Sequence, residues 1–334
     1  MNVELIEIGA DTPGQSNVLR VLTFEGSGNG PAVYLQAGLH AQEIPGLIAL
    51  DQLLPKLQRA EKEGRLASTI TVVPHANPIG LSQSIYGANL GRFDMNSRVN
   101  FNRSFPKPQQ SPANLENTSV VEALKARLLS LALRADIVLD LHCDDEGPVY
   151  IYAPEPLLEG ARVLSAALEA VSILTYNAGS GTSFEETVYL HWCDEAKGGI
   201  PIGKFISTVE LRGMMDVSQS LGEMDAANLY GYLVAIGAIR DDPLRFKSND
   251  PIVSDEVLAE LIPTPVSGAV LYCVDVCERV SAGQCVARIV GEAGTPHHEI
   301  LAPADGFVMT RRERRYLRKG EDVLKILRHS QQKK

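Results

Sequence analysis

The chain lacks the features that mark secreted and membrane proteins. Its longest apolar candidate for a span, residues 226–239, has only fourteen residues, whereas a helix that crosses a bilayer needs about 20. The amino-terminal stretch MNVELIEIGADTPG has no basic residue and no long apolar core, so we expect no secretory signal there. The five cysteines are an odd number without framework spacing, which predicts reduced thiols in a cytoplasmic protein.

The chain also has no excess of basic residues. The net charge of −10 argues against a nucleic-acid binder, which needs a basic face, and against binding to anionic membranes. The one basic run, RRERR at residues 311–315, is typical of a solvated face. With 334 residues, the chain is longer than one ordinary core requires, so we expect two domains.

The first two thirds of the chain alternate between strand and helix patterns. Short apolar runs predict strands buried on both faces at residues 31–37, 68–74 and 136–142. Helical patterns follow at residues 44–64, 117–136 and 154–171, and we expect Pro55 to kink or divide the first of them. The alternation predicts an α/β fold, with a mixed sheet and helices on both faces. In such sheets, ligands bind beyond the carboxyl ends of strands.

The pattern changes in the last third. Residues 241–262 are polar and contain two prolines, which is typical of a linker. Beyond them, PVSGAV at 265–270 recurs as PADGFV at 303–308, and VSAGQCVARI at 280–289 recurs as LRKGEDVLKI at 317–326. Two similar β-rich halves predict a small barrel-like sandwich with internal pseudo-symmetry.

This repeat resembles the lipoyl/biotinyl barrel-sandwich fold. Carrier domains of that fold modify a lysine between the two halves, and residues 265–310 contain no lysine. We therefore expect a structural or gating domain and not a carrier. The predicted organisation is a catalytic domain at residues 1–245 and a β-rich barrel-sandwich-like domain at residues 260–330.

A histidine and a glutamate stand three residues apart in QAGLHAQEIPG, as His40 and Glu43. The chain has seven histidines, so one such pair is what chance supplies. His142, however, ends another predicted buried strand, as His40 follows one. Imidazole nitrogen and carboxylate oxygen are zinc ligands, so the three residues predict a zinc site, with Asp140 orienting a ligand. Taken singly, His142 is equally a strand cap and Asp140 a structural polar residue.

The stretch GRFDMNSRVNFNRSFP, residues 91–106, has three arginines and three asparagines without periodicity. Long irregular segments in compact domains are often functional. The arginine guanidinium binds carboxylates with two hydrogen bonds, so Arg103 beside Asn102 predicts a site for a substrate carboxylate. A solvated loop with structural ion pairs is the alternative.

An acidic residue interrupts the apolar strand pattern of KFISTVELRG, residues 204–213. Burying Glu210 is costly unless it faces a cleft or has a partner. A carboxylate beside a metal site can act as general base, so we expect this role for Glu210. A structural pair with Arg212 is the alternative.

The stretch GSGTSFEE, residues 179–186, is rich in glycine. It lacks the lysine of a phosphate-binding loop. Either it is a surface turn, or it forms a rim of the active site where Glu185 or Glu186 meets a cationic substrate.

The ordered set of motifs is more specific than any one of them. H-x-x-E, then N-x-N-R-x-F-P, D-L-H and V-E-L-R-G resembles the succinylglutamate desuccinylase/aspartoacylase family, which is related to the zinc carboxypeptidases. The likeness covers roughly residues 30–240. It implies a carboxypeptidase-like fold and one zinc ion per chain. One departure from the family pattern is that Asn100 stands where the family usually has aspartate.

The resemblance also implies a role for each matched residue. Zinc is held by His40, Glu43 and His142. Glu210 is the catalytic glutamate, and Asn102 with Arg103 holds the substrate carboxylate. Arg92 is the first choice and Arg98 the second for the arginine that polarises the scissile carbonyl.

The predicted function is zinc-dependent hydrolysis of the amide in a small N-acyl amino acid. A zinc carboxypeptidase acting on peptides is the first alternative. A non-catalytic binding protein that keeps the fold is the second. The sequence identifies neither the acyl group nor the amino acid, and a homo-oligomer is compatible with it.

Overall fold

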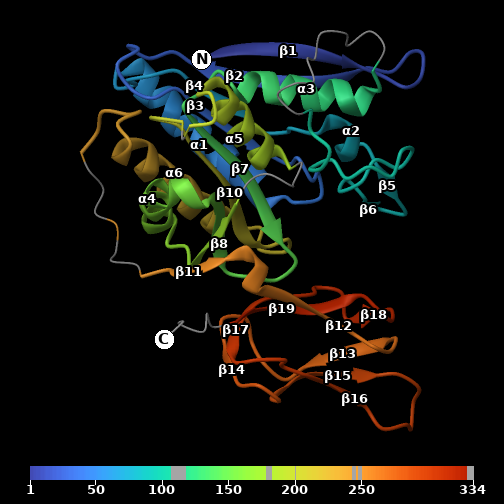
Figure 1. Cartoon of the computed structure of the whole chain (residues 1–334). Helices are drawn as coiled ribbons and strands as arrows, with labels where there is room; N and C mark the ends of the chain where they lie inside the picture. Colours follow the sequence, from blue (N-terminus) through green and yellow to red (C-terminus); the bar gives the residue numbers. More distant parts are fainter. Residues whose placement is uncertain (107–117, 178–182, 200, 243–245, 247–249, 329–334) are drawn as a thin grey trace.

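The computed structural model describes residues 1–106, 118–177, 183–199, 201–242, 246 and 250–328 (Figure 1). A nine-stranded sheet dominates the structure. Its strands, in spatial order, are β1 (Asn2–Gly9), β2 (Asn17–Phe24), β4 (Ile70–Val73), β3 (Val33–Ala37), β7 (Ile137–Asp144), β10 (Phe205–Gly213), β8 (Val149–Pro154), β9 (Ser172–Tyr176) and β11 (Ile252–Asp255). Parallel and antiparallel pairs both occur, so the predicted mixed sheet is confirmed.

The central strands β4, β3, β7 and β10 run parallel to one another. Strand β3 lies between β4 and β7. The connection that follows β3 leads to β4 on one flank of β3, and a later connection leads to β7 on its other flank. This is a topological switch point, where the loops at the carboxyl ends of neighbouring strands diverge and leave a crevice. The segments after β3 and at the end of β7 therefore meet at the same edge of the sheet.

Helices cover both faces of this sheet (Figure 1). One face carries α1 (Pro45–Lys62), α4 (Leu158–Leu168) and α6 (Gln219–Ala235), and the other carries α3 (Val120–Ala132) and α5 (Phe184–Glu195). Shorter elements are α2 (Pro78–Leu81), β5 (Ser84–Ile85), β6 (Ala88–Asn89) and the 3-10 helices η2 (Glu155–Leu157) and η3 (Glu256–Leu258). Helix α1 passes through Pro55 as one element, so of the two expected effects of Pro55, a kink or a division, the division does not occur.

The carboxyl-terminal part forms two four-stranded antiparallel sheets. One contains β12 (Ala259–Pro263), β19 (Asp322–Arg328), β17 (Gly306–Arg311) and β14 (Arg279–Val280). The other contains β16 (His298–Leu301), β15 (Cys285–Val290), β13 (Gly268–Tyr272) and β18 (Tyr316–Leu317). The two sheets share a core of their own. We propose that they are the barrel-sandwich-like domain of residues 260–330, with residues 1–245 as the other domain.

The predicted linker at residues 241–262 is wrong in part. Residues 243–245 and 247–249 lie outside the described residues. Strand β11, however, pairs with β9 and extends the large sheet, and β12 pairs with β19 in a carboxyl-terminal sheet. The β-branched side chains of Ile252 and Val253 favour this extended pairing despite the polar composition.

The RRERR run is a solvated face only in part, because Arg314 and Arg315 are exposed whereas Arg311 and Arg312 are half-buried. Arg311 forms an ion pair of 3.1 Å with Glu146, and Arg312 one of 3.0 Å with Asp145. Both acids follow β7, so the run fixes the carboxyl-terminal sheets against the carboxyl edge of the large sheet (Figure 1). The sequence pattern missed this because the acidic partners lie more than 160 residues away.

In the described part of the chain, no helix is long and apolar enough to cross a membrane. All five cysteines are described, and all are free thiols.

Candidate active site

Two of the predicted metal ligands lie in the turn between β3 and α1. Gly38 has a φ of +72°, a backbone conformation that glycine adopts without strain, and it turns the chain sharply off the strand. The amide N–H of Glu43 donates to the carbonyl of His40 at 3.0 Å. This tight turn brings the two side chains to one side, and both are buried.

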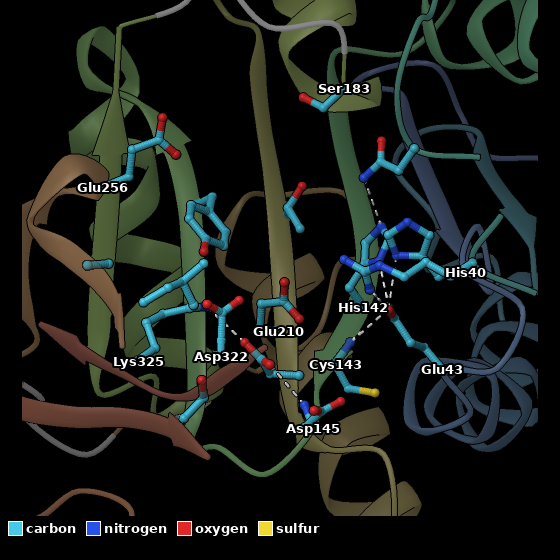
Figure 2. Close-up of a pocket in the computed structure, with 18 of the residues that line it drawn as sticks. His40, Glu43, His142, Cys143, Asp145, Ser183, Glu210, Glu256, Asp322 and Lys325 are labelled. Carbon is cyan, nitrogen blue, oxygen red and sulfur yellow. Dashed lines mark hydrogen bonds and ion pairs between the residues drawn. The ribbon is translucent and has the colours of Figure 1, made fainter. Parts of the chain in front are cut away.

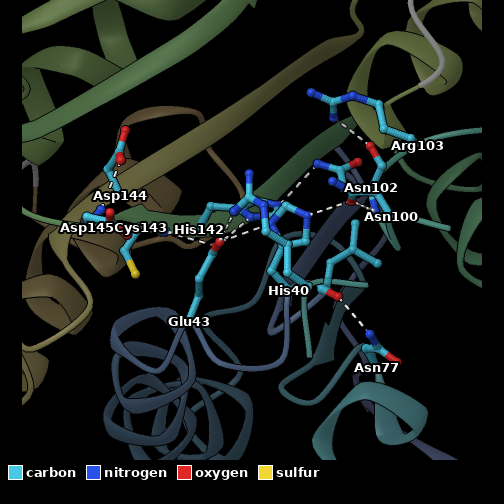
Figure 3. Close-up of polar contacts among 12 residues, drawn as sticks. His40, Glu43, Asn77, Asn100, Asn102, Arg103, His142, Cys143, Asp144 and Asp145 are labelled. Carbon is cyan, nitrogen blue, oxygen red and sulfur yellow. Dashed lines mark hydrogen bonds and ion pairs between the residues drawn. The ribbon is translucent and has the colours of Figure 1, made fainter. Parts of the chain in front are cut away.

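The third predicted ligand, His142, comes from the neighbouring strand β7 and points at the same place (Figure 3). One carboxylate oxygen of Glu43 lies 2.9 Å from Nδ1 of His40, and the other lies 2.7 Å from Nδ1 of His142. One potential ligand atom from each of the three residues lies within 4.8 Å of the others. The structure therefore brings together the three residues that the sequence predicts.

Each imidazole has an oxygen atom within hydrogen-bond distance of its Nε2, the ring nitrogen that does not face Glu43. Nε2 of His142 lies 2.9 Å from the Asp140 carboxylate, and Nε2 of His40 lies 2.9 Å from the Asn100 amide oxygen. Both oxygens are acceptors for an Nε2 proton, so each ring can present its Nδ1 lone pair on the side of Glu43 when a cation is bound there; without an ion, an Nδ1 proton can donate to Glu43 instead. With both Nδ1 atoms unprotonated, the two rings and the carboxylate would all be acceptors and would need a cation between them. The donor set therefore fits a divalent metal, and two imidazoles with one carboxylate suit zinc.

A relay of buried side chains supports Asp140 from behind. The Gln36 amide donates to Asp140 at 2.9 Å, and the Tyr34 hydroxyl donates to Gln36 at 2.8 Å. All three side chains are fully buried. Sequence reasoning missed Tyr34 and Gln36, although polar residues in the buried strand VYLQA were a signal that they have partners.

The charges around the triad favour an ionised Glu43. Burial raises the pKa of this carboxyl, but the imidazoles of His40 and His142 outweigh burial and hold the pKa well below its usual range. The Arg92 guanidinium donates to the same carboxylate at 3.1 Å. An ionised carboxylate is the form that binds a metal ion.

Glu210 lies on β10, directly beside His142 in the strand register. One of its carboxylate oxygens is buried and has no hydrogen-bond partner among the described residues. Burial, together with the charges of Asp144 and Glu43, raises the pKa of Glu210 to about 8. The alternative pair with Arg212 is wrong, because Arg212 bonds Asp225 with two hydrogen bonds of 3.0 and 2.5 Å.

The predicted substrate residues separate into two groups. Arg92, Asn102 and Arg103 line the pocket around the triad. Arg98 is exposed, sits in a left-handed turn with a φ of 60°, and is absent from the pocket lining. The Asn102 amide oxygen accepts from the N–H of Phe184 at 2.8 Å, so this side chain also anchors the start of α5.

The pocket has a volume of about 730 Å³. Its walls come from the large sheet, from η3 and from the carboxyl-terminal strands β17 and β19 (Figure 2). Lys325 of β19 reaches in and contacts the Asp144 carboxylate at 2.9 Å and the Tyr150 hydroxyl at 3.1 Å. Sequence reasoning missed these three residues because no motif links a lysine of one sheet to partners in another.

Comparisons with known proteins match the chain to a family model and to a curated relative. The family model described as Succinylglutamate desuccinylase/Aspartoacylase catalytic domain matches residues 29–196, which is half of the chain. The chain is 24% identical to the N-alpha-acetyl-L-2,4-diaminobutyric acid deacetylase of Halomonas elongata, over 92% of this chain and 85% of that protein.

Solved structures share the fold. One is a succinylglutamate desuccinylase/aspartoacylase family protein from Shewanella amazonensis, with a TM-score of 0.86, 23% identity and 98% of both chains covered. Another is the ectoine utilization protein EutE (DoeB) from Ruegeria pomeroyi, with a TM-score of 0.77, 18% identity, and 97% of this chain and 94% of that chain covered.

Proposed function

The chain belongs to the succinylglutamate desuccinylase/aspartoacylase family, and from this premise we propose that it is a zinc-dependent amidohydrolase that removes the acyl group from a small N-acyl amino acid. One observation carries the proposal. His40, Glu43 and His142 form a buried triad, and beside it lies a carboxylate oxygen of Glu210 that has no hydrogen-bond partner among the described residues. The family name and the name of the Halomonas relative both describe cleavage of an acyl group from an amino acid, which supports this reaction class.

His40 and His142 would hold the zinc ion through Nδ1, and Glu43 through its carboxylate. When bound there, zinc supplies a Lewis acid that polarises a carbonyl and lowers the pKa of water towards about 7. Asp140 and Asn100 keep both imidazoles in the tautomer that presents Nδ1 to the ion. The donor set and its support are the reason for which we propose zinc dependence.

Glu210 is the proposed general base and acid. Its unpartnered oxygen accepts the proton of the attacking water and returns it to the leaving nitrogen. A raised pKa suits this cycle, because a carboxyl with a pKa of about 8 can both take and release a proton near neutral pH. The family match ends at residue 196, so the proposal for Glu210 rests on the geometry of β10.

Arginines position the substrate. Arg103 and Asn102 are proposed to hold its carboxylate, which fixes the amide against the triad and lowers the entropic barrier. Arg92 already contacts Glu43, so it is better placed than Arg98 to stabilise charge that develops on the scissile carbonyl.

The enclosure of the pocket favours small substrates. Strands β17 and β19 and the helix η3 form part of its wall, which leaves less room for a peptide than an open cleft. A carboxypeptidase acting on peptides is therefore the weaker alternative. The triad and Glu210 are all present, which argues against a binding protein that has lost catalysis.

The test is a hydrolysis screen of N-acyl amino acids with purified protein, with and without a chelator and added zinc. We expect turnover of N-acyl amino acids that stops with chelator and returns with zinc. Cleavage of peptides alone, or turnover that is indifferent to chelation, would overturn the proposal.

A further inference from the structure

One wall of the pocket is acidic. It is formed by Glu185 and Glu186 in the first turn of α5 and by Glu256 in η3. Residues 179–182 of the glycine-rich stretch lie outside the described residues, but Glu185 and Glu186 belong to a helix and line the pocket. The alternative of a plain surface turn is therefore wrong for these two residues.

Two other acids of the pocket have cationic partners. Asp144 pairs with Lys325 at 2.9 Å, and Asp145 pairs with Arg312 at 3.0 Å. In the part of the chain that the structure describes, Glu185 and Glu256 form no ion pair. Burial and the charges of neighbouring acids raise the pKa of Glu256, and the charge of Arg103 opposes them only in part. Negative charge is thus in excess at this wall.

A second observation points to a ligand at the same place. The hydroxyl of Tyr176, at the end of β9, has no hydrogen-bond partner among the described residues. Tyr176 is only 7% exposed and lines the pocket. Glu185, Glu186 and Glu256 line the same pocket, and burial first, and then the charges of these three acids, raise the pKa of Tyr176 well above the usual value. A buried hydroxyl without a partner is rare in native proteins.

The acidic wall adjoins the triad. Phe184, next to Glu185 in α5, donates its backbone N–H to Asn102 at 2.8 Å, and the Asn102 side chain lies 3.5 Å from Nε2 of His142. In Figure 2, Glu256 lies to the left and His40 with His142 to the right, with Glu210 between them. A small molecule with its amide at the triad would therefore extend one end towards Glu185 and Glu256.

We propose that the wall of Glu185, Glu186, Glu256 and Tyr176 binds a protonated amino group of the substrate, so that the enzyme prefers N-acyl derivatives of diamino acids. This inference rests on the proposed deacylase function and narrows its substrate class. Ionised carboxylates that lose water are costly without a counter-charge. An ammonium group has three N–H donors, enough for two carboxylates and the Tyr176 oxygen at once, and such charge-assisted bonds are strong.

The experiment compares three substrates that share the acetyl group: Nα-acetyl-L-ornithine, Nα-acetyl-L-norvaline and Nα-acetyl-L-glutamate. They end in a cation, a methyl group and an anion on similar side chains. We expect kcat/KM for the ornithine derivative to exceed that for the norvaline derivative at least tenfold, with the glutamate derivative lowest. Equal values for the ornithine and norvaline derivatives, or a preference for glutamate, would overturn the inference.

Substitutions in the acidic wall test whether its carboxylates cause the preference for the ornithine derivative. Glu256→Gln and Glu185→Gln should each lower the ratio of ornithine to norvaline kcat/KM at least fivefold. Glu4→Gln, an exposed position on β1, is the matched control and should leave the ratio unchanged. If Glu185→Gln fails to fold, the Glu256→Gln ratio decides. A ratio that stays at the wild-type value in a folded Glu256→Gln variant contradicts the inference.

Calorimetry of the full chain separates the two proposals. L-ornithine should bind at least tenfold more tightly than L-norvaline, and Glu256→Gln should reduce this difference. If no acetylated substrate is cleaved but ornithine still binds preferentially, the deacylase proposal fails and the ammonium site stands. If all three substrates are cleaved equally and both amino acids bind equally, the ammonium site fails and the deacylase proposal stands.

Discussion

The carboxylate of Asp140 lies 2.9 Å from Nε2 of His142, two residues further along the same buried strand. Residues i and i+2 of a strand share one face, so D-L-H places an acid and an imidazole side by side. The acid then fixes which imidazole nitrogen carries the proton and leaves Nδ1 to face Glu43 at 2.7 Å. A three-residue motif thus encodes both a proposed metal ligand and its support.

Replacing Asp140 by asparagine tests this support. The amide nitrogen can donate to Nε2, which favours the tautomer with the proton on Nδ1, where the metal would bind. We expect zinc affinity to fall about 10–100-fold, measured by competition with a chromophoric chelator. Circular dichroism should show an intact fold. An unchanged zinc affinity would show that Asp140 has only a structural role.

Removal of the metal should affect stability as well as activity. A ligand that binds the folded state alone stabilises it by RT ln(1 + [L]/Kd), or about 2.7 kcal/mol at 100 times Kd. We expect Tm to rise when zinc is added to chelator-treated protein, in proportion to the logarithm of free zinc. His40→Ala should abolish this rise, because one of three ligands is lost. A rise of the same size in His40→Ala would place the ion elsewhere.

The sequence predicted the central strands from local patterns, and it predicted the triad from those patterns together with the ordered set of family motifs. The apolar runs of β3 and β7 are buried throughout their central residues, so each strand was visible without knowledge of its neighbours. His40 follows one such run and His142 ends the other. Parallel strands bring their carboxyl ends to one edge of the sheet. The local spacing of His40 and Glu43 in a turn then completes the site.

Features that depend on distant pairing were not predictable. Lys325 meets Asp144 across 181 residues, and nothing near either residue indicates the other. Strand β11 belongs to the large sheet through its pairing with β9, although its surroundings are polar. Arg98 and Arg92 lie in one irregular segment, and only the backbone path decides which of them reaches the pocket.

Substitution of Glu210 by glutamine should separate metal binding from turnover. Glutamine keeps the size of the side chain but cannot accept a proton at neutral pH. We expect kcat to fall about 10²–10⁴-fold, the usual contribution of a general base, with one zinc ion per chain retained in elemental analysis. Turnover within a few-fold of wild type would remove Glu210 from the proposed mechanism.

The same residue should shape the pH dependence of stability in chelator-treated protein. The pKa of Glu210 is raised from 4.5 to about 8 by burial and by neighbouring acids. Between these values the folded chain keeps a proton that the unfolded chain has lost, so stability falls as pH rises through this window. Glu210→Gln lacks the effect, and its free energy of unfolding relative to wild type should increase from pH 5 to pH 8. Urea titrations at both pH values measure the difference, and a constant difference would contradict the raised pKa.

The contact of Lys325 with Asp144 should hold the carboxyl-terminal sheets in place. Both side chains are largely buried, with 14% and 22% exposed, so Lys325→Met leaves an acid without its partner and should lower the free energy of unfolding by about 1–3 kcal/mol. Arg288→Met is the matched control, because the Arg288–Glu299 pair is half exposed and surface pairs contribute at most about 1 kcal/mol. Chemical denaturation measures both variants. Equal losses would mean that the contact between the sheets depends on apolar packing, such as that of Met309 and Leu327 with Tyr150 and Leu174, and not on this ion pair.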